Sequence, residues 1–500
     1  MLPKAEGKWT REEAAHLLNR AGFGGTPEEI DRLHAMGRRK AVEHLLSAED
    51  QLPDWENPNG TEQVDPQERF REMREQFRGL SEEERDKKRR EIRQMAQREN
   101  RQAGRDLTGW WFNRMVRTKA PLGEKMVLFW HDHFVSSLQK VRNANLIHQQ
   151  NELFRTNAMG DFRALTKSIV RDPAMMIYLD VANSNKSKPN ENFAREVLEL
   201  FTLGEGNYTE QDIKQAARAF TGYQLNRFTG KVTFQDRRWD GGEKTVLGET
   251  GKFTGEDIVD VIFKQDGATT YLPTKLWEFF VYEGPSEGGV KALGKVFAKA
   301  DFKVKPLLRE IFLSREFYSE KAMRTQIKSP IQFLVGLCRQ MELEGLPVAY
   351  LIGAQLQLGQ VLFQPPNVAG WDWGQAWINT NSLLARYNVA GVVTKGVSAE
   401  TLAVQRGPEG NKERMARGLK FVERNWKGPD YEKVVPRDIR ADSKLLVDHL
   451  MFRLFQSQLG ESERIKFMEF ADAQRGAVFT NTEVAELVHL MMSSPHYQLT

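Results

Sequence analysis

Residues 189–204 read PNENFAREVLELFTLG, and their pattern sets the expectation for the whole chain. Asn190 is a typical N-cap residue and Gly204 is a typical helix stop, so a helix is predicted between them. Apolar side chains cover most of its surface, which indicates that the helix is buried. One stripe at helical spacing is polar instead. It consists of Asn192, Arg195, Glu196 and Glu199.

A buried stripe with two carboxylates is costly unless a counter-charge, a metal ion or hydrogen bonds compensate it. Paired glutamates on a buried helix are typical of carboxylate metal sites in helical bundles. Glu196 and Glu199 are therefore candidate ligands of a divalent metal ion. The alternative is a structural network in which Arg195 and the glutamates tie neighbouring helices together.

Helix signals dominate the chain on both sides of this segment. Capping boxes or Pro-initiated helix starts occur near Thr10, Thr26, Thr209, Thr254 and Ser329, each followed by apolar residues at helical spacing. Strand signals are confined to residues 231–235, with a return near 245–247. The chain is therefore predicted to be mainly α, with one large helical core and a minor β-hairpin.

Residues 62–108 differ from the rest because they are dense in Arg, Glu, Lys and Gln. They predict a protruding charged helical arm, either a solvated hairpin or a partner-binding insertion. Residues 400–442 are polar and predict a linker, and residues 443–497 predict a C-terminal helical segment. The apolar residues of the arm are Phe70, Met73, Phe77, Leu80, Ile92 and Met95.

A second polar motif, FWHDHF at residues 129–134, ends an apolar helix. His131 and His133 are candidate metal ligands, since imidazole suits first-row metals, and Asp132 is a candidate general base. Positions i and i+2 of a helix point to different faces, so both imidazoles reach one ion only if the helix frays. The alternative is a pair of core histidines bonded to the backbone.

Two Gly-rich stretches complete the candidates. Residues 239–248 contain Asp240, a second candidate base, and Lys244, but the spacing is not that of a phosphate-binding P-loop. Residues 363–377 hold three tryptophans on a Pro/Gly loop, an aromatic platform for a sugar, a peptide or the protein's own core. These are Trp371, Trp373 and Trp377.

Composition excludes several classes of protein. The 72 Lys and Arg residues nearly balance the 68 Asp and Glu residues in a chain of 500, which does not indicate a nucleic-acid binder. A single cysteine, Cys338, excludes an intramolecular disulfide and is expected to be a buried thiol.

No run of about 18 apolar residues predicts a membrane span. No signal peptide is visible at the N-terminus, so the chain as given is predicted to be cytoplasmic; a chain whose signal had been removed would look the same.

The motifs at 129–131, 190–196, 199–204 and 208–210 resemble the bacterial family known as domain of unknown function 1800. The stretches at 20–24, 365–371 and 493–495 also fit. The resemblance implies one mainly helical unit over residues 8–500, with the charged arm as an insertion and no established activity. Members are often encoded beside a sulfatase-like family, which implies a possible partner, and many are exported, so a periplasmic location is the alternative. Relatives carry His-Asp where this chain has Trp239-Asp240, which puts any role of that histidine in doubt.

Three hypotheses follow. The first is a metal-dependent enzyme of unknown substrate, with the His and Glu ligands named above and Asp132 or Asp240 as base. The second is a non-enzymatic scaffold or accessory protein whose polar motifs are structural. The third is a glycan- or peptide-binding module that uses the tryptophan loop.

Overall fold

Helices begin where the sequence places their caps. At Thr10 the hydroxyl accepts a hydrogen bond from the Glu13 amide at 3.2 Å, while the Glu13 carboxylate accepts from the Thr10 amide at 3.0 Å. The same reciprocal box occurs at Thr26 and Glu29, with Pro27 in the first turn. These caps satisfy amide groups that have no partner within the helix. The first helices are α1 (Arg11–Ala21), α2 (Pro27–Met36) and α3 (Arg38–Ser47).

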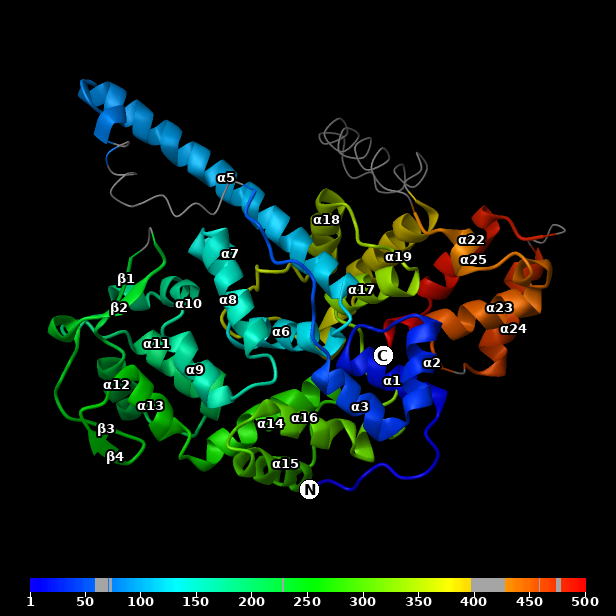
Figure 1. The fold of residues 1–500 in the computed structure, drawn as a ribbon, viewed down its shortest axis with the longest axis horizontal. Helices are drawn as coiled ribbons and strands as arrows, with labels where there is room; N and C mark the ends of the chain where they lie inside the picture. The colour runs from blue at the N-terminus through cyan, green and yellow to red at the C-terminus, as the bar shows by residue number, and fades with distance from the viewer. Residues whose placement is uncertain (59–70, 72–73, 227–228, 397–427, 458, 474–477) are drawn as a thin grey trace.

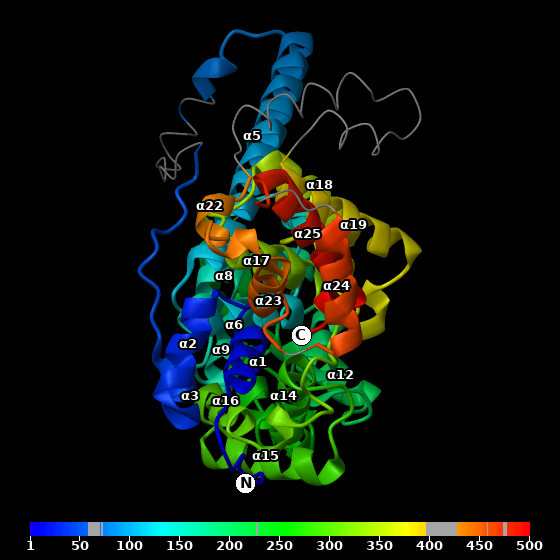
Figure 2. The same ribbon diagram turned by 90° about the vertical axis from the view of Figure 1, so that its right-hand side faces the viewer.

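The computed structural model describes residues 1–58, 71, 74–226, 229–396, 428–457, 459–473 and 478–500. Helix α5 (Glu82–Arg117) projects from the rest of the molecule in both views (Figures 1 and 2), with Ser81 as its N-cap. Its outer part is exposed, whereas burial begins at Ala103 and continues through Trp111.

The charged arm and the core therefore share one continuous helix, which runs past residue 108. Met95, one of the apolar residues of the arm, is 59% exposed and therefore buries little apolar surface. Arg89 lies over the ring of Phe77, at 6.0 Å from the ring centre, which brings the segment before the helix back against it. Phe70 and Met73 lie outside the described residues.

The middle of the chain carries the segment 189–204 and the only strands among the described residues. The predicted hairpin had the wrong partner: residues 232–234 pair with 223–225, and residues 244–246 pair with 249–251. Two separate hairpins form because each strand pairs with its neighbour across a short turn. The elements are α6 (Pro121–His133), α7 (Leu138–Val141), α8 (Ala144–Thr156), α9 (Phe162–Val170), α10 (Pro173–Tyr178), η1 (Val181–Asn183), α11 (Glu191–Glu196), the π-helix η2 (Val197–Leu203), α12 (Glu210–Ala219), β1 (Tyr223–Leu225), β2 (Val232–Phe234), η3 (Asp236–Arg238), β3 (Lys244–Val246) and β4 (Glu249–Gly251).

Apart from α13, which packs against α12, the remaining helices lie towards the centre and the right of Figure 1, away from the two hairpins. Figure 2 shows α1, α23 and α25 around the C-terminus, with α14 and α15 beneath them near the N-terminus. Most of the predicted linker, residues 397–427, lies outside the described residues. The elements are α13 (Gly255–Ile262), α14 (Asp266–Phe280), α15 (Glu287–Lys299), α16 (Val304–Phe312), η4 (Glu316–Tyr318), α17 (Pro330–Gln340), α18 (Val348–Leu358), η5 (Gly374–Trp377), α19 (Thr380–Lys395), α22 (Tyr431–Val434), η7 (Ile439–Ala441), α23 (Ser443–Leu454), α24 (Glu461–Ala473), α25 (Asn481–Ser493) and η8 (Pro495–Gln498).

One apolar core runs through the described chain, from Leu2 to Tyr497. It confirms the prediction of a mainly α protein with one large helical core. Cys338 lies in this core, fully buried and free. No described helix combines the length and the apolar character that crossing a membrane requires.

The burial boundary in α5 makes a first prediction. Deleting residues 66–100, with a short Gly/Ser bridge, is expected to move the melting temperature by no more than about 2–4 °C, because the described residues of that segment bury little apolar surface. The matched comparison is Leu107→Ala in the buried part of α5, which should cost about 2–5 kcal/mol. Loss of the cooperative transition in the deletion variant would show that the arm belongs to the core.

Candidate active site

Helix α6 forms the centre of the candidate site. It starts at Pro121, whose ring favours the first helical turn, and its apolar residues are buried on nearly every side. It nevertheless carries five ionisable side chains, and each such group in a protein interior needs a partner. They are Glu124, Lys125, His131, Asp132 and His133.

The two histidines face different neighbours. His131 Nε2 accepts a hydrogen bond from the Phe363 amide at 3.1 Å. His133 Nε2 donates to the Phe201 carbonyl at 3.0 Å, and its Nδ1 is buried without a partner. Burial lowers the pKa of His131 to about 3 and holds that of His133 well below its usual value. Both rings are neutral and bonded to the backbone, as in one of the two alternatives drawn from the sequence.

The segment 189–204 folds as predicted up to Glu196 and then widens into a π-helix. Asn190 caps α11: its side-chain oxygen accepts from the Phe193 amide, and its amide group donates to the Leu179 carbonyl. The π-helix η2 carries Glu199, whose carboxylate accepts a hydrogen bond from the Tyr208 hydroxyl. Such π-turns are frequent at functional sites.

The predicted polar stripe divides among separate surroundings. Arg195 pairs with Glu210 on α12, at 2.8 and 2.9 Å, on the protein surface, and therefore ties α11 to α12. Glu196 is buried, and burial together with the nearby Glu199 raises its pKa. Asn192 is exposed.

Helix α14 connects the two polar motifs. The Tyr271 hydroxyl donates to the Leu200 carbonyl of η2 at 2.7 Å, and the tyrosine lies close enough to Glu199 for that carboxylate to raise its pKa further. One turn later the half-buried Lys275 lies beside Asp132. Its charge opposes the rise that burial causes in the pKa of Asp132 and adds to the fall that burial causes in the pKa of His133.

Asp132 holds the tryptophan loop in place. Its Oδ1 accepts a hydrogen bond from the Trp371 amide at 2.8 Å, across 239 positions of sequence. The preceding Gly370 has a φ of +89°, and a β-carbon there would lie 2.3 Å from the same Oδ1. Only glycine allows the loop to approach the carboxylate so closely.

Two motifs predicted separately thus line one cavity. Asp132 and Lys125 come from α6, and Trp371, Trp373 and Trp377 from the loop. The space open to the centre of a water molecule is about 10 Å³, room for about one water. The other lining residues are Leu128, Phe279, Ser329, Gln332 and Gln360.

Burial shifts the pKa values of two side chains that line the cavity. Burial of its carboxyl group raises the pKa of Asp132 to about 7, against the opposing effects of the Trp371 amide and Lys275. Burial lowers the pKa of Lys125 well below its usual value, and the neighbouring Arg20 lowers it further. A carboxyl group that titrates near pH 7 is suited to general acid–base catalysis.

The second candidate base has a structural role. Asp240 forms a bidentate pair with Arg218, at 2.7 and 3.0 Å, and that pair lowers its pKa. The buried Lys244 donates to the carbonyls of Asp240 and Gly242, at 2.5 and 2.8 Å. Both residues therefore fix the Gly-rich turn.

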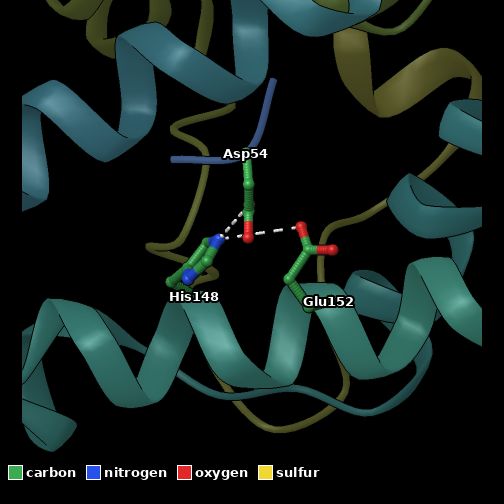
Figure 3. Close-up of side chains that lie close together, drawn as sticks. All are labelled: Asp54, His148 and Glu152. Atoms are coloured by element: carbon green, nitrogen blue, oxygen red, sulfur yellow. Dashed lines mark hydrogen bonds and ion pairs between the residues drawn. The ribbon is translucent and has the colours of Figure 1, made fainter. Parts of the chain in front are cut away.

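The predicted metal ligands do not gather in one place. Among the described residues, one set of three His, Cys, Asp or Glu side chains brings its ligand atoms within 4.8 Å of one another, and none of the four predicted ligands belongs to it. Figure 3 shows this set. His148 and Glu152 stand one turn apart on α8, and Asp54 reaches them from the segment before α5.

This set adjoins a buried ion-pair network. Glu124 is 1% exposed and accepts hydrogen bonds from Trp111, Arg114 and Arg155 at 2.6–3.0 Å. Arg155 also pairs with Glu152. The network contains four carboxylates against two guanidinium groups, so it carries two uncompensated negative charges when His148 is neutral. The carboxylates are Asp50, Asp54, Glu124 and Glu152, and the guanidinium groups are Arg114 and Arg155.

The sequence pattern of the family described as "Protein of unknown function (DUF1800)" matches residues 16–499. The chain belongs to the DUF1800 family. This confirms the resemblance drawn from the motifs. No curated protein and no solved structure matches the chain.

Sequence reasoning missed several groups in this DUF1800 chain. Lys125 stands in an apolar run, and Lys275 lies in a helix with no motif. Asp54 is in an irregular segment, where no periodicity marks a contact. The spacing of His148 and Glu152 at i and i+4 was a usable signal, because it places both on one helix face.

Two glycines provide a test of the contact between Asp132 and the loop. Gly370 and Gly359 have nearly the same φ, +89° and +90°, but nothing lies within 4 Å of a β-carbon at Gly359. Gly359→Ala should cost about 1–2 kcal/mol from its backbone conformation alone. Gly370→Ala should cost about 1–3 kcal/mol more, because it also displaces Asp132. Equal losses in denaturant unfolding would show that the contact contributes nothing.

Proposed function

We propose that this DUF1800 chain is an enzyme that binds a carbohydrate on the tryptophan loop and uses Asp132 as a general acid or base. The observation that carries the proposal is the convergence of Asp132 with Trp371 and Trp373 in one cavity. Neither motif alone points to a reaction. Together they supply a binding surface and a proton-transfer group.

The cavity mouth fits a sugar ring better than a peptide. Trp373 is 42% exposed and packs edge-on against Phe279 at 5.0 Å, so it offers a fixed flat surface for stacking. Side chains of Ser329, Gln332 and Gln360 line the same cavity and suit hydroxyl groups. None of the described strands lines this cavity, so a peptide cannot bind there by adding a strand to a sheet.

Asp132 supports catalysis rather than binding alone. It lines the cavity, together with the three tryptophans, where about one water molecule fits. A carboxyl group with a pKa of about 7 exists in both protonation states at neutral pH, as a proton donor or acceptor requires. Asp132 can therefore donate a proton to a bound carbohydrate or accept one from it.

Turnover of 4-nitrophenyl glycosides and 4-nitrophenyl acetate tests this function. Asp132→Asn should lower turnover about 10²–10⁴-fold while binding is retained, and Trp373→Ala should weaken binding. Wild-type rates should rise with pH through a transition near 7 where Asp132 acts as the base, and fall through it where Asp132 acts as the acid, because the pKa of Asp132 is raised to about 7. Asp240→Asn is the matched control, with folding checked by melting. Full turnover in Asp132→Asn, or loss only in Asp240→Asn, would contradict the proposal.

We also propose that Asp54, His148 and Glu152 bind one divalent cation. His148 Nε2 lies 2.9 Å from Asp54 Oδ1 and 3.6 Å from Glu152 Oε1, close to the separations of atoms that share one zinc ion. The ion-pair network that includes Asp54 and Glu152 has two more carboxylates than guanidinium groups, which favours a cation there. Binding requires that Arg155 release Glu152.

Metal analysis tests this second proposal directly. Protein dialysed against Zn²⁺ and then against buffer should retain about one ion per chain, measured by mass spectrometry. His148→Ala should abolish retention, and His44→Ala, which removes an exposed imidazole, should not. Zinc retention that survives His148→Ala would contradict the assignment. The candidate ligands would then be the four predicted from the sequence: His131, His133, Glu196 and Glu199.

A further inference from the structure

Lys125 differs from every other ionisable residue of α6. Its ammonium group is fully buried and, among the described residues, has no hydrogen-bond partner. Its nearest aromatic contacts are the faces of Phe23 and Phe279, with ring centres at 5.1 and 5.2 Å. It also lines the cavity that contains Asp132.

The charges around Lys125 do not neutralise it. Arg20 on α1 is its nearest cationic neighbour, is also buried, and donates to Gln326 and to the Ala322 carbonyl rather than to a carboxylate. Burial lowers the pKa of Arg20 to about 9. Asp132, the one carboxylate that lines the cavity, lies beside Lys275. The described residues around Lys125 thus offer it no carboxylate partner.

An unpaired buried lysine is expensive to keep in an apolar core. A hydrophobic residue of similar shape commonly stabilises a protein when it replaces buried charge. A bound water molecule would satisfy one N–H group but would leave the charge uncompensated. Loss of the ammonium proton lowers this cost, in keeping with the lowered pKa of Lys125, but it leaves a buried amine without a partner. An anion beside the group would both keep it protonated and pair it.

We infer that the cavity receives an anionic substituent of the carbohydrate, a carboxylate or a phosphate, which pairs with Lys125. The inference rests on the function proposed above and names its substrate class. One oxygen atom of the anion takes the place of the single water molecule for which the cavity has room, while the rest of the group and the sugar ring stay outside, against Trp373. Carboxylate and phosphate share the chemistry that Lys125 recognises.

Titration of intrinsic tryptophan fluorescence with glucuronate, glucose 6-phosphate and glucose tests the inference. Wild-type protein should bind at least one anionic sugar about tenfold or more tightly than glucose, the effect of one charge-assisted hydrogen bond. Whether glucuronate or glucose 6-phosphate is preferred distinguishes the two anions. Lys125→Met should reduce the preference to less than about twofold and raise the melting temperature of the ligand-free protein. Lys125→Arg should keep the preference.

Lys167→Met controls for the loss of one positive charge, because Lys167 pairs with Asp260 and does not line the cavity. This variant should leave the preference unchanged. If Lys125→Met fails to fold, Lys125→Gln replaces it. Equal affinity of wild-type protein for glucose and both anionic sugars would overturn the inference and leave the proposed function intact. Absence of any sugar-dependent fluorescence change would overturn both.

Discussion

Burial of charge in helix α6 is the constraint on which the rest of the structure depends. Five of its thirteen residues are ionisable, although the helix is enclosed by apolar neighbours. Each buried polar group is costly until it is paired, so the surrounding segments are held where they supply partners. Glu124 holds α5 and α8, His131 holds the chain at Phe363, and Asp132 holds the tryptophan loop.

These contacts join residues that are far apart in the sequence, and they help to fix how the segments of the fold are arranged. Loop closure over more than 200 residues costs conformational entropy, which a single neutral hydrogen bond does not offset. The large shared core supplies the free energy, and the polar contacts of α6 select one arrangement within it. The Glu124 network has the same character: removing a partner from such a network commonly costs about 3–5 kcal/mol, although the intact network adds little net stability.

Local features of the fold were predictable, and pairings were not. The caps at Thr10 and Asn190 follow from neighbouring residues, so the sequence predicts them correctly. The predicted partner of residues 232–234 was wrong, because short strands with little burial carry no signal that fixes their pairing. Asp132 and Trp371 were each identified as candidates, but nothing in either motif indicates that they touch. Lys125 was missed because one lysine among apolar residues is typical of an amphipathic helix edge.

The polar motifs of this DUF1800 chain therefore need not serve one function. One nitrogen each of His131 and His133 is bonded to the backbone, Arg195 pairs with Glu210, and Asp240 pairs with Arg218. These groups already have partners within the fold, although His133 Nδ1 has none among the described residues. A group already paired in the resting protein must give up that partner before it can act on a ligand, and the lost pairing opposes binding. Lys125 meets no such opposition. Asp132 keeps its hydrogen bond to the Trp371 amide through Oδ1 and can still exchange a proton at neutral pH, because its pKa is about 7. The unpaired amine and the carboxyl group with the raised pKa are therefore the side chains of α6 that can act at the least cost to the fold.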